Sequence, residues 1–461
     1  MPKTAAIILA AGLGTRMKSS LPKVLHRAAG LPLIAYPLAN LKQLKLAPVL
    51  LVVGKNQALV KEETHRLGHK SVSAVVQDPP LGTAHAVLTA MKRLKNFTGD
   101  ILILYGDMPL LKVQTIRDLV QTHRERQAVL TFLTAVLPNP FGYGRVLRTS
   151  RFDPCGIVEE KEATPEQKRI QEINVGVYVV NAAVLSEKLK TIGNQNVKGE
   201  YYLTDLVALA FHEQKNLATV VLADPNEGLG VNTQADLTVV NELCHRRQIQ
   251  RLMEEGVSFA TFENVAVDAG VKVGGGTRIG GGVSLLGKTR IGGRCVIESG
   301  TVIRDSVIGD GVTIKANSYI EEGVVESNAS IGPFARLRPG AHIGSKAKVG
   351  NFVEIKKTRI GEGSKVNHLS YIGDARIGIG VNIGAGTITC NYDGFNKSKT
   401  VIEDQVFVGS DTQFIAPVRI GRGAVIGAGS TITKNVKPKS LALTRAPQVE
   451  IKNWVRRKKT K

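Results

Sequence analysis

Aliphatic residues recur at every sixth position over long stretches of the second half of the chain. The first stretch consists of Val273, Ile279, Leu285, Ile291, Ile297 and Ile303, and the spacing returns over 331–355 and over 402–432. A helix repeats every 3.6 residues and a strand every 2, so neither explains this pattern. A parallel β-helix of hexapeptide repeats does, because each aliphatic side chain fills the axis and glycine follows at the corner. Three repeats predict a triangular coil of about eighteen residues.

Up to about residue 230, apolar runs alternate with helix-like stretches instead. The apolar runs include Pro48–Gly54, Val72–Gln77, Asp100–Leu104 and Ala128–Leu137. Between them, Thr83–Leu94 and Gln114–Gln127 are typical of helices. This alternation predicts a mostly parallel sheet with helices on both faces.

A polar segment separates the two patterns. Gln234–Glu255 reads as one helix, and Gly256 ends it. The sequence therefore predicts an α/β domain over 1–234, a linker helix over 235–255 and a β-helix over 256–461.

Length and composition limit the classes of protein that remain. A chain of 461 residues is too long for one ordinary core, and 43% hydrophobic residues suffice for globular packing. No apolar run approaches the roughly 20 residues of a membrane helix, and Gly12 breaks the N-terminal run, which predicts a core strand rather than a signal peptide. The four cysteines include no C-x-x-C pair, which argues against a disulfide framework or zinc site and favours a cytoplasmic protein.

The net charge of +22 favours anionic partners, which include nucleic acid, acidic lipid and phosphorylated small molecules. Basic residues are scattered except in the tail Arg456–Lys461, where a solvated chain end is the simpler interpretation. A nucleic-acid-binding scaffold would need aromatic platforms or a reading motif, and Trp454 is the single tryptophan. We therefore expect neither nucleic-acid binding nor stable membrane insertion.

The first apolar run ends in a glycine-rich turn, AAGLGTRMKSSLPK. Such a turn can point backbone N–H groups at an anion. It lacks the third glycine of a dinucleotide fingerprint, where Met17 stands, and the Gly-Lys-Ser/Thr ending of a Walker A loop. Gly12 and Gly14 can also serve only to let a helix pack close to the sheet. Arg16 and Lys23 favour a polyphosphate site, since a bidentate cation and a point cation lie near the turn.

Asp107 follows the buried run Asp100–Leu104 in the segment DILILYGDMPL. Open α/β sheets bind their ligands at the carboxyl ends of strands, and a hard carboxylate beside phosphates suits Mg²⁺. The alternative is a helix cap before Met108 and Pro109.

The repeat half offers two histidines, His342 and His368, both off the inward aliphatic positions. A neutral imidazole is a suitable general base near pH 7, although a surface histidine without function is the default. Arg338 and Lys356 are eighteen residues apart, so they should lie in register on neighbouring coils. Either an anion lies between these two cations or their side chains splay into water, and the spacing leaves both open.

Motifs in a fixed order carry a resemblance to a known family. LAAGLGTRM followed by LPK resembles the signature of the sugar-nucleotide pyrophosphorylases, which join a nucleoside triphosphate to a sugar 1-phosphate. The further motifs are QDPPLGTAHA, LYGDMPLL, FGYGRV, GIVEEKEA, QEINVGVY, GEYYLTD, GVNTQADL, GPFARLRPGA, NFVEIKKTRIG, NHLSYIGDA, VNIGAGTITCNYDG and VFVGSDTQ. With them, the whole chain resembles the bacterial bifunctional N-acetylglucosamine-1-phosphate uridylyltransferases and glucosamine-1-phosphate acetyltransferases. The resemblance implies a Rossmann-like nucleotidyltransferase domain and a left-handed β-helix.

For the first half, the resemblance implies uridylyl transfer from UTP to N-acetylglucosamine 1-phosphate. The residues expected along the nucleotide and its phosphates are Leu9, Ala10, Ala11, Gly12, Lys23, Gln77, Gly82 and Thr83. Those expected around the sugar and ribose are Tyr105, Gly106, Gly144, Glu159 and Asn174. Mg²⁺ is expected on Asp107 and Asn232, with Lys23 and Arg16 stabilising charge on the leaving pyrophosphate.

For the second half, the resemblance implies acetyl transfer from acetyl-CoA to glucosamine 1-phosphate, with His368 as the base. The residues expected around the sugar phosphate are Arg338, Lys356, Tyr371 and Asn382. Those expected to contact acetyl-CoA are Ala385, Asn391, Tyr392, Ser410, Ala428 and Arg445. Thr389–Lys399 interrupts the six-residue spacing, as an inserted binding loop would.

The resemblance also implies a cytoplasmic homotrimer that supplies UDP-N-acetylglucosamine for peptidoglycan and lipopolysaccharide precursors. The main alternative is a pyrophosphorylase for another nucleotide or sugar whose β-helix is only regulatory or oligomeric. The segments around His368 and Asn391–Tyr392 argue against this alternative.

Overall fold

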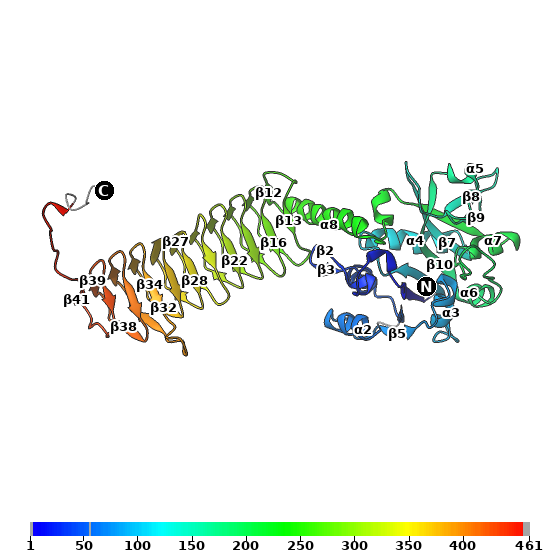
Figure 1. The fold of residues 1–461 in the computed structure, drawn as a ribbon. Helices are drawn as coiled ribbons and strands as arrows, with labels where there is room; N and C mark the ends of the chain where they lie inside the picture. The colour runs from blue at the N-terminus through cyan, green and yellow to red at the C-terminus, as the bar shows by residue number, and fades with distance from the viewer. Residues whose placement is uncertain (1–2, 55–56, 455–461) are drawn as a thin grey trace, which may run out of the picture. The chain divides into compact units, whose positions relative to one another are not determined.

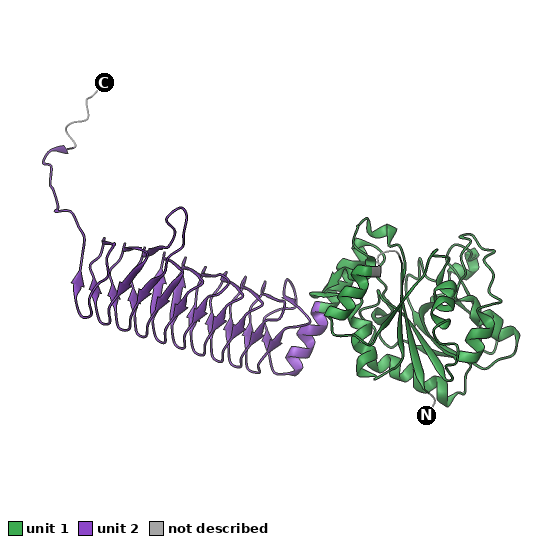
Figure 2. Cartoon of the chain, turned by 90° about the horizontal axis from the view of Figure 1, so that it is seen from below, with its two compact units in different colours: residues 1–244 green, residues 245–461 purple. Residues whose placement is uncertain are grey.

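The computed structural model describes residues 3–54 and 57–454, and the basic tail Arg456–Lys461 lies outside these ranges. The chain divides into two compact units, 1–244 and 245–461 (Figure 2). Helix α8 (Gln234–Glu254), green in Figure 1, contributes residues to both units. Within the described ranges, no helix is long and apolar enough to cross a membrane.

A mixed sheet forms the centre of unit 1. Its strands are β1 (Thr4–Ala10), β4 (Val49–Val53), β5 (Ser73–Val76), β6 (Asp100–Tyr105), β7 (Leu130–Val136), β8 (Arg145–Arg148), β9 (Pro154–Val158), β10 (Glu172–Asn181) and β11 (Leu217–Val221). The order across the sheet is β11-β7-β10-β6-β1-β4-β5, with the β8–β9 hairpin attached at β10 (Figure 1). Neighbours pair in parallel except around β10, which runs antiparallel to β6 and β7. The mostly parallel sheet expected from the sequence is confirmed.

Helices cover both faces of this sheet, as the alternating pattern predicts. Successive residues of β1 enter different cores, with Ile7 in one and Ile8 in the other. The helices that pack in the Ile7 core are α3 (Thr83–Met91), α6 (Ala182–Lys188) and α7 (Asp205–His212). Those that pack in the Ile8 core are α1 (Ala35–Gln43), α2 (Gln57–Arg66) and α4 (Val113–Glu125). The buried sheet thus holds its strand ends, and the loops that follow them, in fixed positions.

Unit 2 is a three-faced parallel β-helix (Figure 1). The first face runs from β12 (Ser258–Phe259) to β41 (Leu441–Ala442), and the second from β13 (Ala266–Val267) to β40 (Thr431–Ile432). The third runs from β14 (Lys272–Val273) to β38 (Val418–Ile420). Residues at the six-residue spacing form one continuous buried core along the axis. The hexapeptide-repeat fold is confirmed, and the strand arrangement is consistent with a left-handed β-helix.

The coils do not all span eighteen residues. Arg336 pairs with Glu354, eighteen residues later, but Val302 pairs with Tyr319, seventeen residues later. At such a shorter coil the chain turns at Asp305, which has a left-handed φ of 46°. The expectation of uniform coils is wrong there, because the inward Ile308 follows the inward Ile303 after five residues instead of six.

The expected interruption of the repeats is an insertion between two coils. The strands on either side of it, β32 (Ala375–Ile377) and β35 (Thr400–Ile402), pair directly in register. The intervening segment completes β34 (Ile388–Cys390) and then leaves the stack as a loop, orange in Figure 1. Phe395 in this loop is 91% exposed, so the insertion adds surface rather than core.

Candidate functional site

The glycine-rich turn leaves the sheet at the end of β1 and enters the short helix η1 (Thr15–Met17). Gly14 has a left-handed φ of 61°. A Cβ on Gly14 would lie 3.1 Å from Lys23 Cβ, so glycine permits both the turn and the close approach of Lys23. A Cβ on Gly12 would meet no atom within 4 Å. The first glycine therefore faces open space rather than a packed helix.

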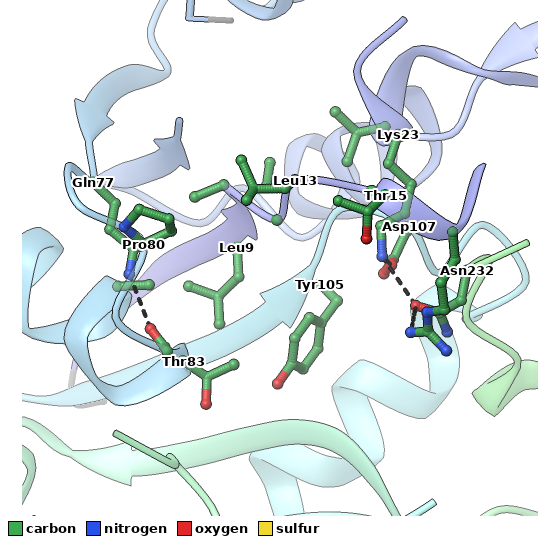
Figure 3. A pocket seen from close by; sticks show the side chains of 18 of the residues that line it. Leu9, Leu13, Thr15, Lys23, Gln77, Pro80, Thr83, Tyr105, Asp107 and Asn232 are labelled. Carbon is green, nitrogen blue, oxygen red and sulfur yellow. Dashed lines mark hydrogen bonds and ion pairs between the residues drawn. The ribbon is translucent and has the colours of Figure 1, made fainter. Parts of the chain in front are cut away.

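This turn forms one wall of a cavity of about 380 Å³ (Figure 3). The expected residues that line it are Leu9, Ala10, Ala11, Gly12, Arg16, Lys23, Gln77, Gly82, Thr83, Tyr105, Asp107 and Asn232. The lining also includes Leu13, Gly14, Thr15, Val24, Pro80, Ala86 and Glu200. β1 and β6 bring the two main walls together, because they are parallel neighbours that end side by side.

Two positively charged side chains meet two side chains that carry oxygen acceptors in this cavity (Figure 3). Lys23 forms an ion pair with Asp107, and its Nζ donates to Asn232 Oδ1 at 3.2 Å. Arg16 Nη2 donates to the same oxygen at 2.9 Å. Asp107 does not cap α4, whose N-cap is Lys112, so the helix-cap alternative is wrong. The fold thus gathers four side chains from three separate regions of the sequence.

Asn232 is positioned by the first turn of α8. Asp236 Oδ2 accepts hydrogen bonds from the backbone N–H groups of Asn232 at 2.9 Å and Thr233 at 2.8 Å. Thr233 Oγ1 in turn accepts from the Asp236 N–H at 3.1 Å. This reciprocal arrangement resembles a capping box. Sequence reasoning missed the role of Asp236, although the Thr-x-x-Asp spacing before a helix was the available signal.

Asp107 and Asn232 offer the hard oxygen atoms that divalent cations prefer. Among the described residues, no group of three or more His, Cys, Asp or Glu side chains is arranged to hold a metal ion. The donor set therefore fits a cation that takes its remaining ligands from a bound phosphate or from water, as Mg²⁺ commonly does.

Glycines shape the neighbouring walls. Gln77 Nε2 donates to Gly82 O at 2.9 Å, and Gly82 has a φ of 109°. A Cβ on Gly82 would lie 2.6 Å from Tyr201 O, so a side chain does not fit there. Gly106 is not among the lining residues, and a Cβ on it would lie 2.9 Å from Ile34 Cδ1. A side chain at Gly106 would crowd Ile34, and the expected contact of Gly106 with the sugar stays a prediction.

The other expected sugar-binding residues lie against one another, outside the cavity lining. Asn174 N donates to Gly144 O at 2.9 Å, and a Cβ on Gly144 would lie 3.7 Å from Glu159 Oε1. Thr204 Oγ1 donates to Glu159 Oε1 at 3.2 Å. Burial raises the pKa of Glu159 and the pKa of Tyr105. Thr204 was missed by sequence reasoning, although it lies in the motif GEYYLTD.

In unit 2, several expected residues lie along one edge of the β-helix. His368 ends β30 (Lys365–His368), two residues after an inward valine. Ala385, Ser410 and Ala428 occupy the equivalent corner on the following coils. Backbone hydrogen bonds join these corners, with Ala385 O and Ser410 O accepting from the next coil. The stacking therefore extends in a line from His368 towards the C-terminal coils.

His368 and His342 have different partners. His368 is exposed, and its Nδ1 lies 2.8 Å from Oδ1 of Asn351, which occupies the same corner one coil earlier. An amide oxygen accepts a hydrogen bond, so this contact puts the proton on Nδ1 and the lone pair on Nε2. His342 Nε2 instead lies 2.6 Å from Glu326 Oε1. Asn351 was missed by sequence reasoning.

Arg338, Lys356 and Tyr371 belong to neighbouring coils of the second face. The strands that precede Arg338 and Lys356 pair in register, and Arg338 N donates to Ile355 O. The two cations therefore lie on neighbouring coils, as their spacing predicts. Arg338 Nη1 donates to Glu354 Oε1 at 2.8 Å, so a carboxylate offsets the charge of one of the two stacked cations. A Cβ on Gly373, which pairs with Lys356, would collide with the Tyr371 hydroxyl. Glycine therefore makes room for this ring beside Lys356.

The remaining expected residues are spread over the same region of the β-helix. Asn382 stands on the first face, between Lys365 and Phe407. Asn391 and Tyr392 begin the inserted loop, and Asn391 donates a hydrogen bond to Asp374. Arg445 Nη2 would lie 3.6 Å from a Cβ on Gly427, which places this guanidinium beside the corner that carries Ala428.

Comparison with known proteins connects both units to one family. The model of the MobA-like NTP transferase domain matches residues 6–154, and the model of the bacterial transferase hexapeptide (six repeats) matches residues 399–434. Bifunctional protein GlmU of Pelobacter propionicus is 46% identical over 461 residues, covering 100% of both chains. The protein of the same name from Syntrophotalea carbinolica is 49% identical over 450 residues, covering 98% of this chain and 96% of its own. The chain belongs to the family of bifunctional GlmU proteins.

Proposed function

We propose that this chain makes UDP-N-acetylglucosamine by two transfers, one on each unit. Residues 256–461 would move acetyl from acetyl-CoA to glucosamine 1-phosphate. Residues 1–234 would then move uridylyl from UTP to the resulting N-acetylglucosamine 1-phosphate and release pyrophosphate, with 235–255 as the linker helix. The observation that carries the proposal is the cavity in which the glycine turn, Arg16, Lys23, Asp107 and Asn232 meet (Figure 3).

In uridylyl transfer, the protein supplies binding and charge rather than a nucleophile. The turn at Gly12 would offer backbone N–H groups to the phosphates, and Arg16 and Lys23 would balance the charge that develops on pyrophosphate. Mg²⁺ on Asp107 and Asn232 would neutralise phosphate charge when bound. The oxygen of the sugar phosphate would attack the α-phosphorus directly.

The remaining residues of unit 1 would orient the two substrates. Gln77, Gly82 and Thr83 would hold the uracil ring. Glu159 and Asn174 would accept and donate hydrogen bonds to the sugar and ribose hydroxyls beside Tyr105.

In acetyl transfer, His368 would take a proton from the substrate amine at Nε2 as the nitrogen attacks the thioester carbonyl and the CoA thiolate leaves. The contact with Asn351 supports this role, because it leaves Nε2 free to accept. Arg338, Lys356 and Tyr371 would bind the sugar phosphate. Acetyl-CoA would follow the edge that carries Ala385, Ser410 and Ala428, with Arg445 near its phosphates.

We also propose that the protein is a cytoplasmic homotrimer. The flat faces of a β-helix suit association about a threefold axis, and the exposed His368 lies on an open edge. Sedimentation equilibrium should give three times the chain mass of 49.5 kDa. A monomer that transfers acetyl at the full rate would contradict the trimer.

Mass analysis of products tests the two activities together. Incubation with UTP, acetyl-CoA and glucosamine 1-phosphate should yield UDP-N-acetylglucosamine when Mg²⁺ is present. With the metal chelated, N-acetylglucosamine 1-phosphate should accumulate instead. If acetyl-CoA were not consumed in either case, the β-helix would be only regulatory or oligomeric.

A further inference from the structure

The two side chains that would hold a divalent cation are already paired with cations of the protein itself (Figure 3). Asp107 is in an ion pair with Lys23. Asn232 Oδ1 accepts from Lys23 Nζ at 3.2 Å and from Arg16 Nη2 at 2.9 Å. The ammonium group of Lys23 therefore contacts both Asp107 and Asn232.

A divalent cation cannot bind Asp107 Oδ2 and Asn232 Oδ1 together while Lys23 Nζ contacts both atoms. Mg²⁺ binds oxygen at about 2.1 Å and so needs the region that the Lys23 ammonium group now occupies. The Lys23 and Asp107 side chains are only 17% and 10% exposed, so water and salt screen the pair less than a surface pair. A metal ion there would also be repelled by Lys23 and Arg16. The protein without nucleotide should thus bind divalent cations poorly.

We propose that Lys23 blocks the metal site until a nucleoside triphosphate binds. Phosphate oxygens offer Lys23 and Arg16 new anionic partners, which frees Asp107 and Asn232, and they also complete the coordination of the cation. Metal and triphosphate would therefore bind with positive coupling. This inference rests on the proposed nucleotide site and adds the order in which its charges are exchanged.

Titration of the full-length protein with Mn²⁺ tests the block, with the unbound ion measured by electron paramagnetic resonance and no nucleotide present. Lys23→Met keeps the aliphatic stem and removes the charge, and it should bind Mn²⁺ at least about tenfold more tightly than the wild type. Lys18→Met is the matched control, because Lys18 lies in the same turn region but is exposed. It should change the affinity by less than about twofold. Adding Asp107→Asn to Lys23→Met should remove the gain, which locates the binding at Asp107.

Equal affinity for Mn²⁺ in the wild type and in folded Lys23→Met would overturn the inference. If Lys23→Met does not fold, Lys23→Gln provides a second test, since its neutral amide removes the ammonium charge and should also raise the affinity. An unchanged affinity in folded Lys23→Gln would then overturn it. Equilibrium dialysis of UTP with the wild type is a separate measurement. Failure of UTP to bind would refute the proposed nucleotide site, whereas the nucleotide-free Mn²⁺ comparison still decides whether Lys23 blocks the cation.

Discussion

The two histidines of the β-helix differ in what their rings contact. His368 Nδ1 faces an amide oxygen, whereas His342 Nε2 faces the Glu326 carboxylate. The hydrogen bond from His342 lowers the pKa of Glu326, because it stabilises the ionised carboxylate. His368 therefore presents Nε2 for a substrate proton, whereas Nε2 of His342 is held by Glu326.

If His368 is the general base, His368→Ala should reduce acetyl transfer by about 10²–10⁴-fold, the usual contribution of a positioned base. Uridylyl transfer from supplied N-acetylglucosamine 1-phosphate should stay near the wild-type rate, because no residue of unit 1 changes. His342→Ala is the control and should leave both rates nearly unchanged. If His342→Ala reduced acetyl transfer and His368→Ala did not, the assignment of His368 as the general base would be wrong.

Asp205 shows how a buried acid affects stability. Burial, with Glu162 and Glu159 nearby, raises the pKa of Asp205 from its usual 3.8 to about 6. The folded protein then holds this proton more tightly than the unfolded chain. The free energy of unfolding consequently falls as the pH rises from about 4 towards 6, and the loss persists above 6.

Asp205→Asn removes this penalty and should stabilise unit 1 more at pH 7.5 than at pH 5, where only part of the penalty has developed. The gain should be about 1 kcal/mol, less than the full shift implies, because Asp205 is partly exposed and therefore partly screened by solvent. Thermal unfolding at the two pH values measures it, with Asp118→Asn on the surface of α4 as the control. A larger loss of stability at pH 7.5 than at pH 5 would contradict this explanation.

Among the elements, α8 does more than connect the units, since its first turn holds Asn232 through Asp236. Asp236→Ala should cost about 1 kcal/mol of stability, as the loss of a helix cap usually does. It should also raise the Mg²⁺ concentration needed for half-maximal uridylyl transfer, because Asn232 becomes less well positioned. Acetyl transfer should not change.

The variant Asp236→Asn separates capping from charge, since its amide oxygen can still accept both N–H groups. It should retain most of the wild-type response to Mg²⁺. An unchanged Mg²⁺ response in Asp236→Ala would show that Asn232 does not depend on this cap.

The spacing of apolar residues along the chain was sufficient to predict most elements. It identifies which residues are buried, as the apolar run of β1 and the six-residue repeat that includes Ile355 show. The tight corner at Asp305 was missed, although the inward residue after Ile303 is Ile308, five positions later instead of six. Pairings over long separations were also missed. The hydrogen bond from Lys23 to Asn232 cannot be predicted from spacing alone. The same is true of the contact between Asn351 and His368, which places the ring proton on Nδ1. Most residue roles came from motif resemblance, and they remain predictions.

At the scale of the whole molecule, each unit has its own core, so the two transfers should be separable. The residues proposed for uridylyl transfer lie in unit 1, and those proposed for acetyl transfer lie in unit 2. The intermediate N-acetylglucosamine 1-phosphate would then pass through solution between different sites. A defect in one unit should therefore be complemented by another molecule whose defect lies in the other unit.

The most direct test mixes Asp107→Ala with His368→Ala and measures the products formed from UTP, acetyl-CoA and glucosamine 1-phosphate with Mg²⁺. Asp107→Ala alone should accumulate N-acetylglucosamine 1-phosphate, because it lacks only a metal ligand of unit 1. His368→Ala alone should form little of any product, yet it should convert supplied N-acetylglucosamine 1-phosphate. The mixture should restore UDP-N-acetylglucosamine. Loss of both activities in a folded Asp107→Ala, with no product from the mixture, would contradict two independent sites.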